Sequence, residues 1–318
     1  MGHFLLFLDF IRSTLRMYGL WKQTASTVFD YKTTNGTIFN LRRNTFDSGV
    51  IMESWWLKSY ARNLKNIQNN AVIIDIGAHI GAFSLFAAKK YAQSHVFAFE
   101  PSPKNFELLN KNIKANNLTR RISSFNIAVT DGKKKVVMLN EHPSNLGMHS
   151  VVFDYNLREK GQRYEVPTTS LARILSEYKI KTCHLLKLDC EGAEYSILFA
   201  TPKNTLEKIN NIVMEYNDYD QIGKLKEFLE EAGFETIFYQ TLPIPHRDKE
   251  GAFYPFPYSY VPYYYAEASE ILDLKLAPDI IGIQFVNFNE AKRMLAPGHN
   301  HDKILEYLIK SRSININE

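Results

Sequence analysis

The chain has 318 residues, of which 45% are hydrophobic, enough for one large globular domain or two small ones. Its 38 Lys and Arg residues against 34 Asp and Glu residues give a formal net charge of +4 at pH 7. This small excess is not gathered into one basic arm, so no nucleic-acid partner is expected. The two cysteines lie on one predicted strand, too far apart to bridge each other, which favours a reducing, cytoplasmic location.

An amphipathic helix is predicted over residues 4–20, with Asp9 and Arg12 on its polar side. The apolar run at its start is too short to cross a bilayer and lacks the basic residues of a secretory signal. We expect this helix to pack on the protein's own core. The alternative is a weak contact of residues 1–20 with a membrane surface, which would make the protein membrane-associated.

Residues 1–70 are expected to form this helix and a cap segment that precedes the main domain. Two short strands, 29–31 and 37–41, flank an Asn-Gly turn and predict a hairpin. A helix is predicted over 50–64. Its early acid, Glu53, is a candidate to face a ligand, or else a first-turn acid that favours the helix dipole.

From residue 71 the pattern becomes a regular alternation of strand and helix. The stretch 72–83 predicts a buried strand, a glycine turn and the start of a helix. Gly77 and Gly81 in this turn allow a ligand to approach the backbone closely. Nineteen residues after Gly81, the next predicted strand ends in Glu100. An acid at that place can accept hydrogen bonds from both hydroxyls of a ribose.

Two features separate this unit from a dinucleotide site. The turn is Gly-x-x-x-Gly rather than Gly-x-Gly-x-x-Gly, so no pyrophosphate loop is present. The first strand also carries its own acid, Asp75, which would repel a phosphate but suits a cation. S-adenosylmethionine has a ribose, an ammonium, a sulfonium and no phosphate, and it fits this pattern. A nicotinamide cofactor, or a turn that binds nothing, are the alternatives.

The remaining elements follow in order. Pro103 starts a helix capped by Ser102, and a third strand over 122–129 places Asn126 and Ala128 near its carboxyl end, where they could read an adenine. Short strands that interrupt the rhythm predict a small antiparallel addition. The later elements are predicted as strands 135–139, 149–153 and 163–167, helix 171–178, strands 183–188 and 212–214, helix 221–232 closed by a glycine, and strands 234–239 and 280–286.

Alternating strands and helices predict a mainly parallel sheet with helices on both faces. Ligands of such sheets bind beyond the carboxyl ends of the strands. Asp75, Glu100, Asp189 and Glu215 all lie at predicted strand ends of this kind. Four acids at four strand ends are the main internal indication of a site.

The main domain is expected to span 71–290, and 291–318 to form a helical tail. Between the last two predicted strands, an insert at about 241–278 is rich in tyrosine and proline. Prolines prevent a helix there, and tyrosines combine apolar faces with polar tips. We expect a lid over the acceptor site, or alternatively a loop packed on the domain.

Three motifs, in this order, resemble the FkbM-type methyltransferases: the turn at 75–81, the Glu-Pro-Ser-Pro step at 100–103 and the Lys-Leu-Asp-Cys-Glu-Gly-Ala-Glu block at 187–194. The resemblance covers about residues 45–240. It implies a Rossmann-like class I methyltransferase fold of the α/β class, with a mainly parallel seven-stranded sheet. It also implies S-adenosylmethionine as methyl donor and usually O-methylation, often of sugars or natural products.

The resemblance also implies the roles of individual residues. The turn would line the methionine part of the donor, Glu100 would hold the ribose, Asn126 would lie near the adenine and Asp189 near the sulfonium. His79 occupies a turn position where the family tends to have a small polar residue such as Asn. The expected donor contacts are Glu53, Asp75, Gly77, Ala78, His79, Gly81, Glu100, Pro101, Ser102, Asn126, Ala128 and Asp189.

A hydroxyl acceptor must lose its proton, so a base is needed near the donor. Asp189 and Glu191 are the favoured candidates, followed by His149, and Glu215 is also possible. Glu194 is expected to bond backbone at a helix start. No metal ligand is assigned, although an acidic block of this kind could hold Mg²⁺. The acceptor is expected to be a small molecule or a glycan. N-methylation and a binding or scaffold role without catalysis are the alternatives.

Overall fold

The structure is a computed structural model of the whole chain. It describes residues 28–43, 45–56, 60, 64, 67–140, 150–151, 163–215, 221–240 and 262–268. The chain divides into one unit of Met1–Thr241 with Pro262–Glu270 and a second of Leu242–Val261 with Ile271–Glu318. Every described residue belongs to the first unit, so the fold is that of this unit alone.

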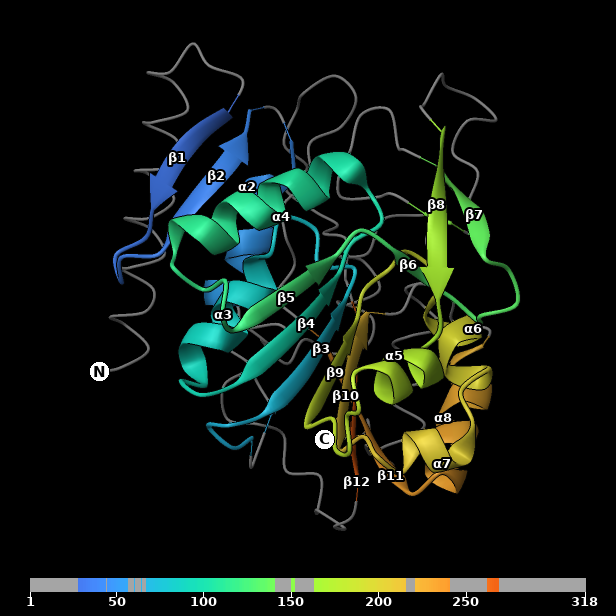
Figure 1. Cartoon of the computed structure of the whole chain (residues 1–318). Coiled ribbons are helices and arrows are strands. Elements are labelled where there is room, and N and C mark those ends of the chain that lie inside the picture. Colours follow the sequence, from blue (N-terminus) through green and yellow to red (C-terminus); the bar gives the residue numbers. More distant parts are fainter. Residues whose placement is uncertain are drawn as a thin grey trace, which may run out of the picture. The chain divides into compact units, whose positions relative to one another are not determined.

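A sheet of seven strands, in the order β11-β12-β10-β9-β3-β4-β5, lies at the centre of the described part (Figure 1). Its strands are β3 (Val72–Ile76), β4 (His95–Phe99), β5 (Ile122–Phe125), β9 (Leu185–Leu188), β10 (Asn211–Glu215), β11 (Phe234–Gln240) and β12 (Pro262–Ala268). Neighbours from β5 to β10 are parallel, whereas β12 is antiparallel to both β10 and β11. This is the mainly parallel seven-stranded Rossmann-like sheet that the sequence predicted.

The order of the strands marks the place of a ligand. The chain moves outward from β3 through β4 to β5, and then returns to β9 on the other side of β3. The connections therefore diverge beside β3. Open α/β sheets bind ligands at such switch points, outside the carboxyl ends of the strands.

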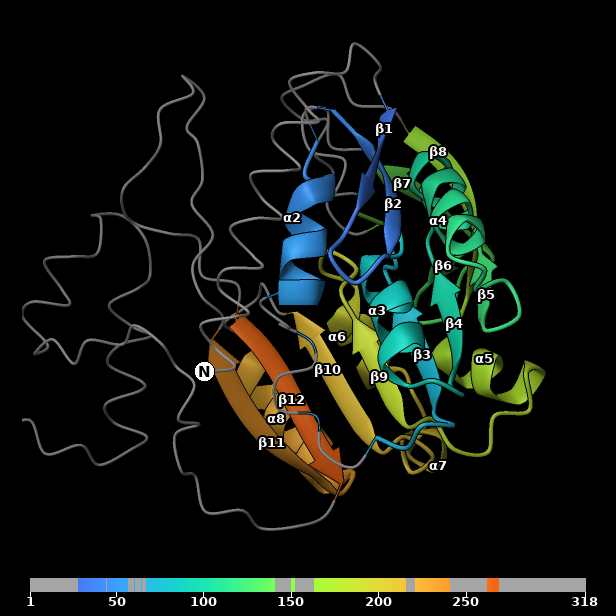
Figure 2. The same cartoon turned by 90° about the vertical axis from the view of Figure 1, so that its left-hand side faces the viewer.

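Helices cover both faces of the sheet (Figures 1 and 2). Figure 1 shows α3 and α4 on one side and α5 to α8 on the other. The helices are α3 (Ala82–Lys90), α4 (Pro103–Ala115), α5 (Leu171–Glu177), α6 (Glu194–Phe199), α7 (Lys203–Leu206) and α8 (Ile222–Glu231). Because both faces are covered, the central strands read as continuous apolar runs and not as alternating ones. All four residues of β9 are buried.

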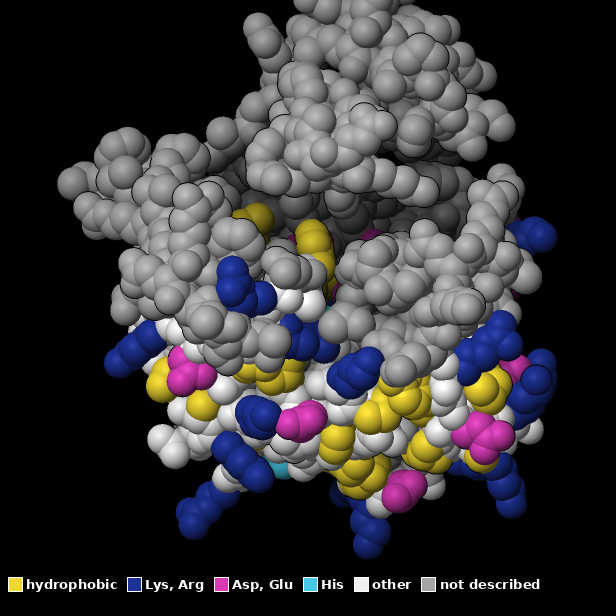
Figure 3. Space-filling model, turned by 90° about the horizontal axis from the view of Figure 1, so that it is seen from above, with side chains coloured by type: hydrophobic (Ala, Val, Ile, Leu, Met, Phe, Trp, Pro, Cys, Tyr) yellow, Lys and Arg dark blue, Asp and Glu magenta, His cyan; other side chains and the backbone are white. Residues whose placement is uncertain are grey.

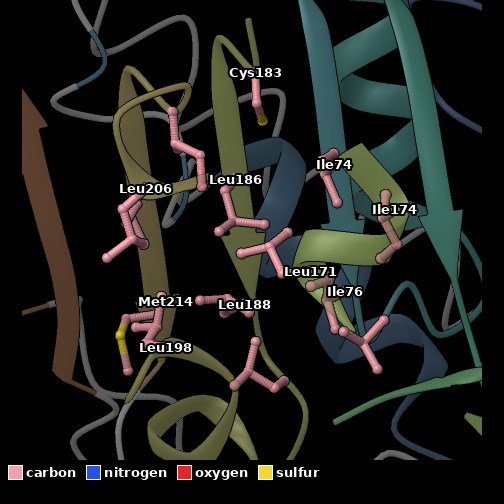
Figure 4. Close-up of a cluster of buried hydrophobic side chains, with 14 of the residues drawn as sticks. Ile74, Ile76, Leu171, Ile174, Cys183, Leu186, Leu188, Leu198, Leu206 and Met214 are labelled. Atoms are coloured by element: carbon pink, nitrogen blue, oxygen red, sulfur yellow. The ribbon is translucent and has the colours of Figure 1, made fainter. Parts of the chain in front are cut away.

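The core on the α5 to α8 side is built from alternate residues of the central strands (Figure 4). Ile74 and Ile76 of β3 and Leu186 and Leu188 of β9 are at most 2% exposed. They pack with side chains of the covering helices: Leu171 and Ile174 of α5, Leu198 of α6 and Leu206 of α7. These aliphatic contacts fix the ends of β3 and β9 side by side.

Serine caps begin two of the helices, as predicted. The Ser102 hydroxyl accepts a hydrogen bond from the Asn105 amide, and Pro103 stands at the first turn of α4. The Ser170 hydroxyl accepts one from the Arg173 amide at the start of α5. Each cap satisfies one amide that the first helical turn leaves without a partner.

The predicted hairpin is present as β1 (Val28–Lys32) and β2 (Ile38–Arg42). Asparagine side chains of α4 hold its edge strand. The Asn40 amide donates to Asn112 Oδ1 at 2.6 Å, and the Ile38 amide donates to Asn116 Oδ1 at 3.0 Å. The hairpin therefore pairs with α4 through side-chain amides that take the place of a neighbouring strand.

After the hairpin come α2 (Asp47–Ile51) and η1 (Met52–Trp56), a single turn of π-helix. The Trp55 indole donates to the Ala82 carbonyl at 2.9 Å, at the start of α3. The predicted helix over 50–64 thus begins earlier, and beyond Trp56 only Tyr60 and Leu64 of it are described.

The small addition is a three-stranded sheet in the order β6-β8-β7. It consists of β6 (Ala128–Val129), β7 (Val136–Asn140) and β8 (Arg163–Thr169), and β7 is antiparallel to β8. The predicted strand over 122–129 is therefore two strands in different sheets. The break is at Asn126, whose Nδ2 donates to the carbonyls of Glu100 and Pro101, both at 2.9 Å, and so turns the chain.

The seventh strand differs from the predicted one. It is β12, which lies within the expected aromatic insert, while residues 280–286 are outside the described residues. Consecutive tyrosines have high strand propensity, and a proline is tolerated as the first residue of a strand. The expected helix 4–20, the helical tail 291–318 and the rest of the insert also lie outside the described residues. The boundaries expected at 70 and 290 stay predictions.

Among the described residues, no helix combines the length and the apolar character needed to cross a membrane. Cys183 and Cys190 are both free thiols. On the face shown in Figure 3, Lys and Arg side chains are spread over the surface with Asp and Glu between them.

Candidate functional site

Acids converge at the carboxyl edge of the sheet, beside the switch point. The last residues of β3, β4 and β9 are level in register, so the segments that follow them start at one edge. Glu100 follows β4 directly, Asp189 follows β9, and Glu215 is the last residue of β10. Asp75 is the fourth of the five residues of β3. The sequence had placed these acids at strand ends.

The turn after β3 fits closely between the two neighbouring strands. Gly77 has φ +76°, and its amide and that of Ala78 both donate to the Phe99 carbonyl at 3.0 Å. A Cβ on Gly77 would lie 1.7 Å from the Asp189 carbonyl oxygen. Gly81 has φ +87°, and a Cβ there would lie 2.6 Å from Leu109 Cδ1. The positive φ favours glycine at both positions, and at Gly77 the fixed backbone of Asp189 also leaves no room for a Cβ.

Glu100 is 4% exposed, and its carboxyl joins two backbone segments. Oε2 accepts from the His79 amide at 2.8 Å, and Oε1 accepts from the Ser102 amide at 2.9 Å. Burial raises the pKa of Glu100 to about 7, although these hydrogen bonds and that of Asn105 oppose the rise. The carboxyl has more acceptor positions than these bonds use, so further hydroxyl donors fit it.

The His79 side chain faces the N-terminal hairpin. His79 has a left-handed backbone, φ +50°, and its Nε2 lies 3.7 Å from Asp47 Oδ1. Asp47 is fully buried and accepts from Arg42 Nη2 at 2.7 Å. Burial raises the pKa of Asp47, but the Arg42 hydrogen bond and the charges of His79 and Arg42 hold it below its usual value. The cap segment is thus linked to the turn through His79.

A lysine stands in the middle of the site. Lys187 of β9 is 2% exposed, and its ammonium is 3.2 Å from Asp75 Oδ1 and 3.4 Å from Asp189 Oδ2. It also donates to the Gly77 carbonyl at 2.8 Å. The second oxygen of Asp75 accepts from the Ser84 hydroxyl at 2.6 Å. The Asp75 carboxyl is thus fully buried and bound between α3 and β9.

Four carboxyl groups, which we name the acid cluster, interact at the ends of β9 and β10: Glu53, Asp189, Glu191 and Glu215. Burial and then the charges of Asp189 and Glu191 raise the pKa of Glu215 well above its usual value. Burial acts to raise the pKa of Asp189. The charge of Lys187 and hydrogen bonds with Glu215 and Tyr60 outweigh burial, so this pKa lies below its usual value. The pKa values of Asp189 and Glu215 are thus shifted in opposite directions, with that of Asp189 lowered and that of Glu215 raised.

The turn that contains Glu191 has a strained backbone, and hydrogen bonds to Glu194 hold it in place. Glu191 has φ +56°, and burial followed by the charges of Asp189, Glu194 and Glu53 raises its pKa to about 8. Glu194 accepts from the Cys190 and Gly192 amides at 2.6 and 2.8 Å, so it bonds backbone at the start of α6, as predicted. Left-handed backbone at non-glycine residues gathers at functional sites.

The other expected site residues lie around this edge. Asn126 donates to the carbonyls of Glu100 and Pro101, Ser102 caps α4, and Ala128 is buried in β6. Glu53 is 8% exposed on η1, and its charge acts on Glu191 and Glu215. His149 lies outside the described residues.

Two polar groups of the site were missed by sequence reasoning. Tyr60 was expected only as an apolar anchor, but its hydroxyl donates to Asp189 Oδ2 at 2.7 Å. Lys187 was noted only as part of a motif. A lysine between leucines in a buried strand was the available signal, because lysine is almost never fully buried without a partner. In the described part of the chain, no group of three or more His, Cys, Asp or Glu is arranged to hold a metal ion.

Comparisons with known proteins agree with this geometry. The family described as "Methyltransferase FkbM domain" matches residues 75–236. Methyltransferase sdnD of Sordaria araneosa is 25% identical over 199 residues, which are 54% of this chain and 77% of that protein. Methyltransferase 1 of Beauveria bassiana is 27% identical over 181 residues, 52% and 73% of the two chains. The 31-O-demethyl-FK506 methyltransferase FkbM of Streptomyces tacrolimicus is 24% identical over 204 residues, 57% and 78% of the two chains.

Proposed function

The chain belongs to the FkbM family of S-adenosylmethionine-dependent methyltransferases, and on that premise we propose that it methylates a hydroxyl oxygen of a sugar, glycan or other natural product. The observation that carries the proposal is the acid cluster, because a hydroxyl acceptor needs a carboxyl or similar base beside the methyl donor. The name of the relative from Streptomyces tacrolimicus, 31-O-demethyl-FK506 methyltransferase, describes an O-methyl transfer by that protein, which supports the same chemistry here.

Residues at the ends of β3 and β4 fit the donor. We assign the ribose hydroxyls to Glu100, whose carboxyl is desolvated and has acceptor positions left. We assign the methionine part to the Gly77–Gly81 turn with Asp75, Ala78 and His79, and the positive sulfonium side to Asp189 and Glu53. Pro101, Ser102, Asn126 and Ala128 are proposed to border the adenine. A carboxyl-rich edge of the sheet without a phosphate-binding loop suits a nucleoside that carries positive charge.

S-adenosylmethionine supplies, when bound, a methyl group on a sulfonium sulfur. Glu191 is proposed to take the proton of the acceptor hydroxyl as the C–O bond forms and the C–S bond breaks, with the electron pair of that bond left on sulfur. A base whose pKa lies near the working pH is the most effective, and that of Glu191 is about 8. Asp189, kept ionised by Lys187, is proposed to supply the fixed negative charge next to it.

The ribose assignment is tested by Glu100→Ala. Calorimetry with S-adenosylhomocysteine should show at least a tenfold loss of affinity, since buried hydroxyl donors would lose their acceptor. Glu107→Ala is the matched control, because Glu107 is on the adjacent helix α4 with its side chain 68% exposed. Unchanged affinity in Glu100→Ala would remove Glu100 from the donor site.

The hydroxyl assignment is tested with methyl-labelled donor and a panel of saccharides and small alcohols beside matched amines. We expect label in ethers, and Glu191→Gln should lower the rate by about 10²–10⁴-fold while affinity for S-adenosylhomocysteine changes little. Label found only in amines would replace this proposal by N-methylation. Donor binding without transfer to any acceptor would favour a binding role. His149 is the second candidate base, and His149→Ala belongs in the same series.

We also propose that the protein works in the cytoplasm, with residues 1–20 able to contact a membrane surface. Two free thiols are consistent with a reducing compartment. The membrane contact is tested by flotation with liposomes: a protein lacking residues 1–20 should float less than the full chain, and equal flotation would exclude this role.

A further inference from the structure

We propose that Lys187 is a positioning residue of the methyl transfer, which fixes the donor turn and the acid cluster relative to each other. The proposal rests on the function proposed above. It concerns a residue in the interior of the sheet, which none of the assignments so far uses directly.

The contacts of Lys187 join two separate segments. Its ammonium donates to the Gly77 carbonyl of the turn at 2.8 Å and lies 3.4 Å from the carbonyl of Ile76, the last residue of β3. It is also 3.4 Å from Asp189 Oδ2, at the end of β9. An ammonium has three donors and no acceptor, so one group can hold a carbonyl of the donor turn and a carboxylate of the cluster at once.

Burial makes this arrangement demanding. A buried ammonium is tolerated only where carboxylates and hydrogen bonds replace its water. Burial lowers the pKa of Lys187, but Asp75 and Asp189 outweigh burial and raise it, so the side chain stays charged. The ammonium also lies 5.2 Å from the centre of the Tyr60 ring, and the Tyr60 hydroxyl donates to the Asp189 carboxylate.

Lys187 also decides the protonation of its partner. Its charge is the largest of the effects that hold the pKa of Asp189 down against burial. Without it, Asp189 would face mainly other acids and would protonate at higher pH. The charged and titratable groups around Asp189 and the cluster are Lys187 of β9, Asp75 of β3, Tyr60, Glu53 of η1, Glu215 of β10, Cys190 and Glu191 of the turn, and Glu194 of α6. The charge of Lys187 also acts on Glu100, whose pKa is about 7 and which therefore titrates in the same range.

If Lys187 had a purely structural role, a folded variant with an apolar side chain at this position would still bind the donor normally. An apolar side chain of similar length would fill the same space, but removing one member of a buried ion pair leaves its carboxylates uncompensated and is strongly destabilising. It would leave the Gly77 carbonyl without its donor and Asp189 without its cation. The turn and the carboxylate would then no longer be tied together, although the fold could persist.

The experiment measures S-adenosylmethionine affinity by calorimetry between pH 5 and pH 8.5 in the wild type, Lys187→Met and Lys187→Arg. Urea unfolding of each variant establishes that it is folded. At pH 8 the methionine variant should bind at least tenfold more weakly. Its further loss of affinity on acidification should begin about 1–3 pH units higher than in the wild type, because a neighbouring cation lowers a carboxyl pKa by that amount.

Lys187→Arg keeps the charge, so its loss of affinity on acidification should begin at the same pH as in the wild type. Lys226→Met is the matched control, since Lys226 is a half-exposed lysine of α8 whose ammonium lies 3.6 Å from Glu230 Oε1 in the next turn, and its profile should be that of the wild type. The proposal would be overturned by a folded Lys187→Met that binds with wild-type affinity and loses affinity on acidification at the wild-type pH.

Should Lys187→Met not fold, the double variant Asp75→Asn with Lys187→Met removes both members of the buried pair. It should fold, bind at least tenfold more weakly than Asp75→Asn alone, and lose affinity on acidification from a higher pH than Asp75→Asn alone does. Binding like that of the wild type would overturn the proposal. Failure of the proposed function would look different: the wild type would methylate amines only, while the dependence of donor binding on Lys187 would remain.

Discussion

Gly77→Ala should separate the donor turn from the end of β9. A Cβ at this position would lie 1.7 Å from the Asp189 carbonyl oxygen and 2.7 Å from its carbon. Real Cβ atoms essentially never come closer than 3.0 Å, so the two backbones would have to move apart by about 1.3 Å. No flexible side chain can absorb this movement, because the obstacle is backbone of a buried strand end.

The expected magnitude has two parts. Holding a non-glycine residue at φ +76° costs about 1–2 kcal/mol. Forcing an extra carbon into a well-packed interior costs about 1–3 kcal/mol more. The free energy of unfolding should therefore fall by about 2–5 kcal/mol, as measured by urea unfolding at pH 7.5. Affinity for S-adenosylhomocysteine should fall as well, because the same movement displaces both the turn and Asp189.

Two other glycines serve as controls. Gly233 has φ +92° and no atom within 4 Å of a Cβ, so Gly233→Ala measures backbone strain without a collision. Gly223 lies inside α8, also with nothing within 4 Å, and Gly223→Ala should stabilise the protein by about 0.5–1 kcal/mol. The reasoning is refuted if Gly77→Ala loses no more stability than Gly233→Ala and still binds S-adenosylhomocysteine normally.

Three further outcomes follow from single side chains. The pKa of Glu100 is about 7 in the folded state against an ordinary 4.5, so between these pH values the folded state keeps a proton that the unfolded state has lost. The free energy of unfolding should therefore fall by on the order of 3 kcal/mol between pH 4.5 and pH 7. Urea unfolding of Glu100→Gln should lack this decline. Asp47→Asn leaves Arg42 without its carboxylate and should cost about 3–5 kcal/mol at pH 7. Because the folded pKa of Asp47 lies below its usual 3.8, that difference should shrink as the pH falls through the folded value, and a constant difference would contradict the ion pair. Ser102→Ala should cost about 1 kcal/mol in thermal or urea unfolding, like Ser170→Ala, and no loss in either would argue against the caps.

Local patterns predicted the central elements because each is a short-range property. The glycine turn, the apolar strands and the serine caps depend on residues within a few positions of one another, and all are present. The predicted strand over 122–129 failed where a distant contact intervened: Asn126 bonds the carbonyls that follow β4 and breaks the strand. The seventh strand of the sheet is β12, whereas the expected strand 280–286 lies outside the described residues. The tyrosines of β12 have high strand propensity, but its place between β10 and β11 is a long-range contact that no local pattern records.

What the sequence determined by itself was the set of acids and the edge of the sheet on which they lie, since in a parallel sheet every strand ends at the same side. Only the tertiary structure decided which of these acids face one another, which of them have a raised pKa, and that a lysine from β9 and a tyrosine hydroxyl bind the same carboxylate. Protonation and pairing depend on burial and on distances between strands far apart in the chain, and no local pattern of residues records these quantities.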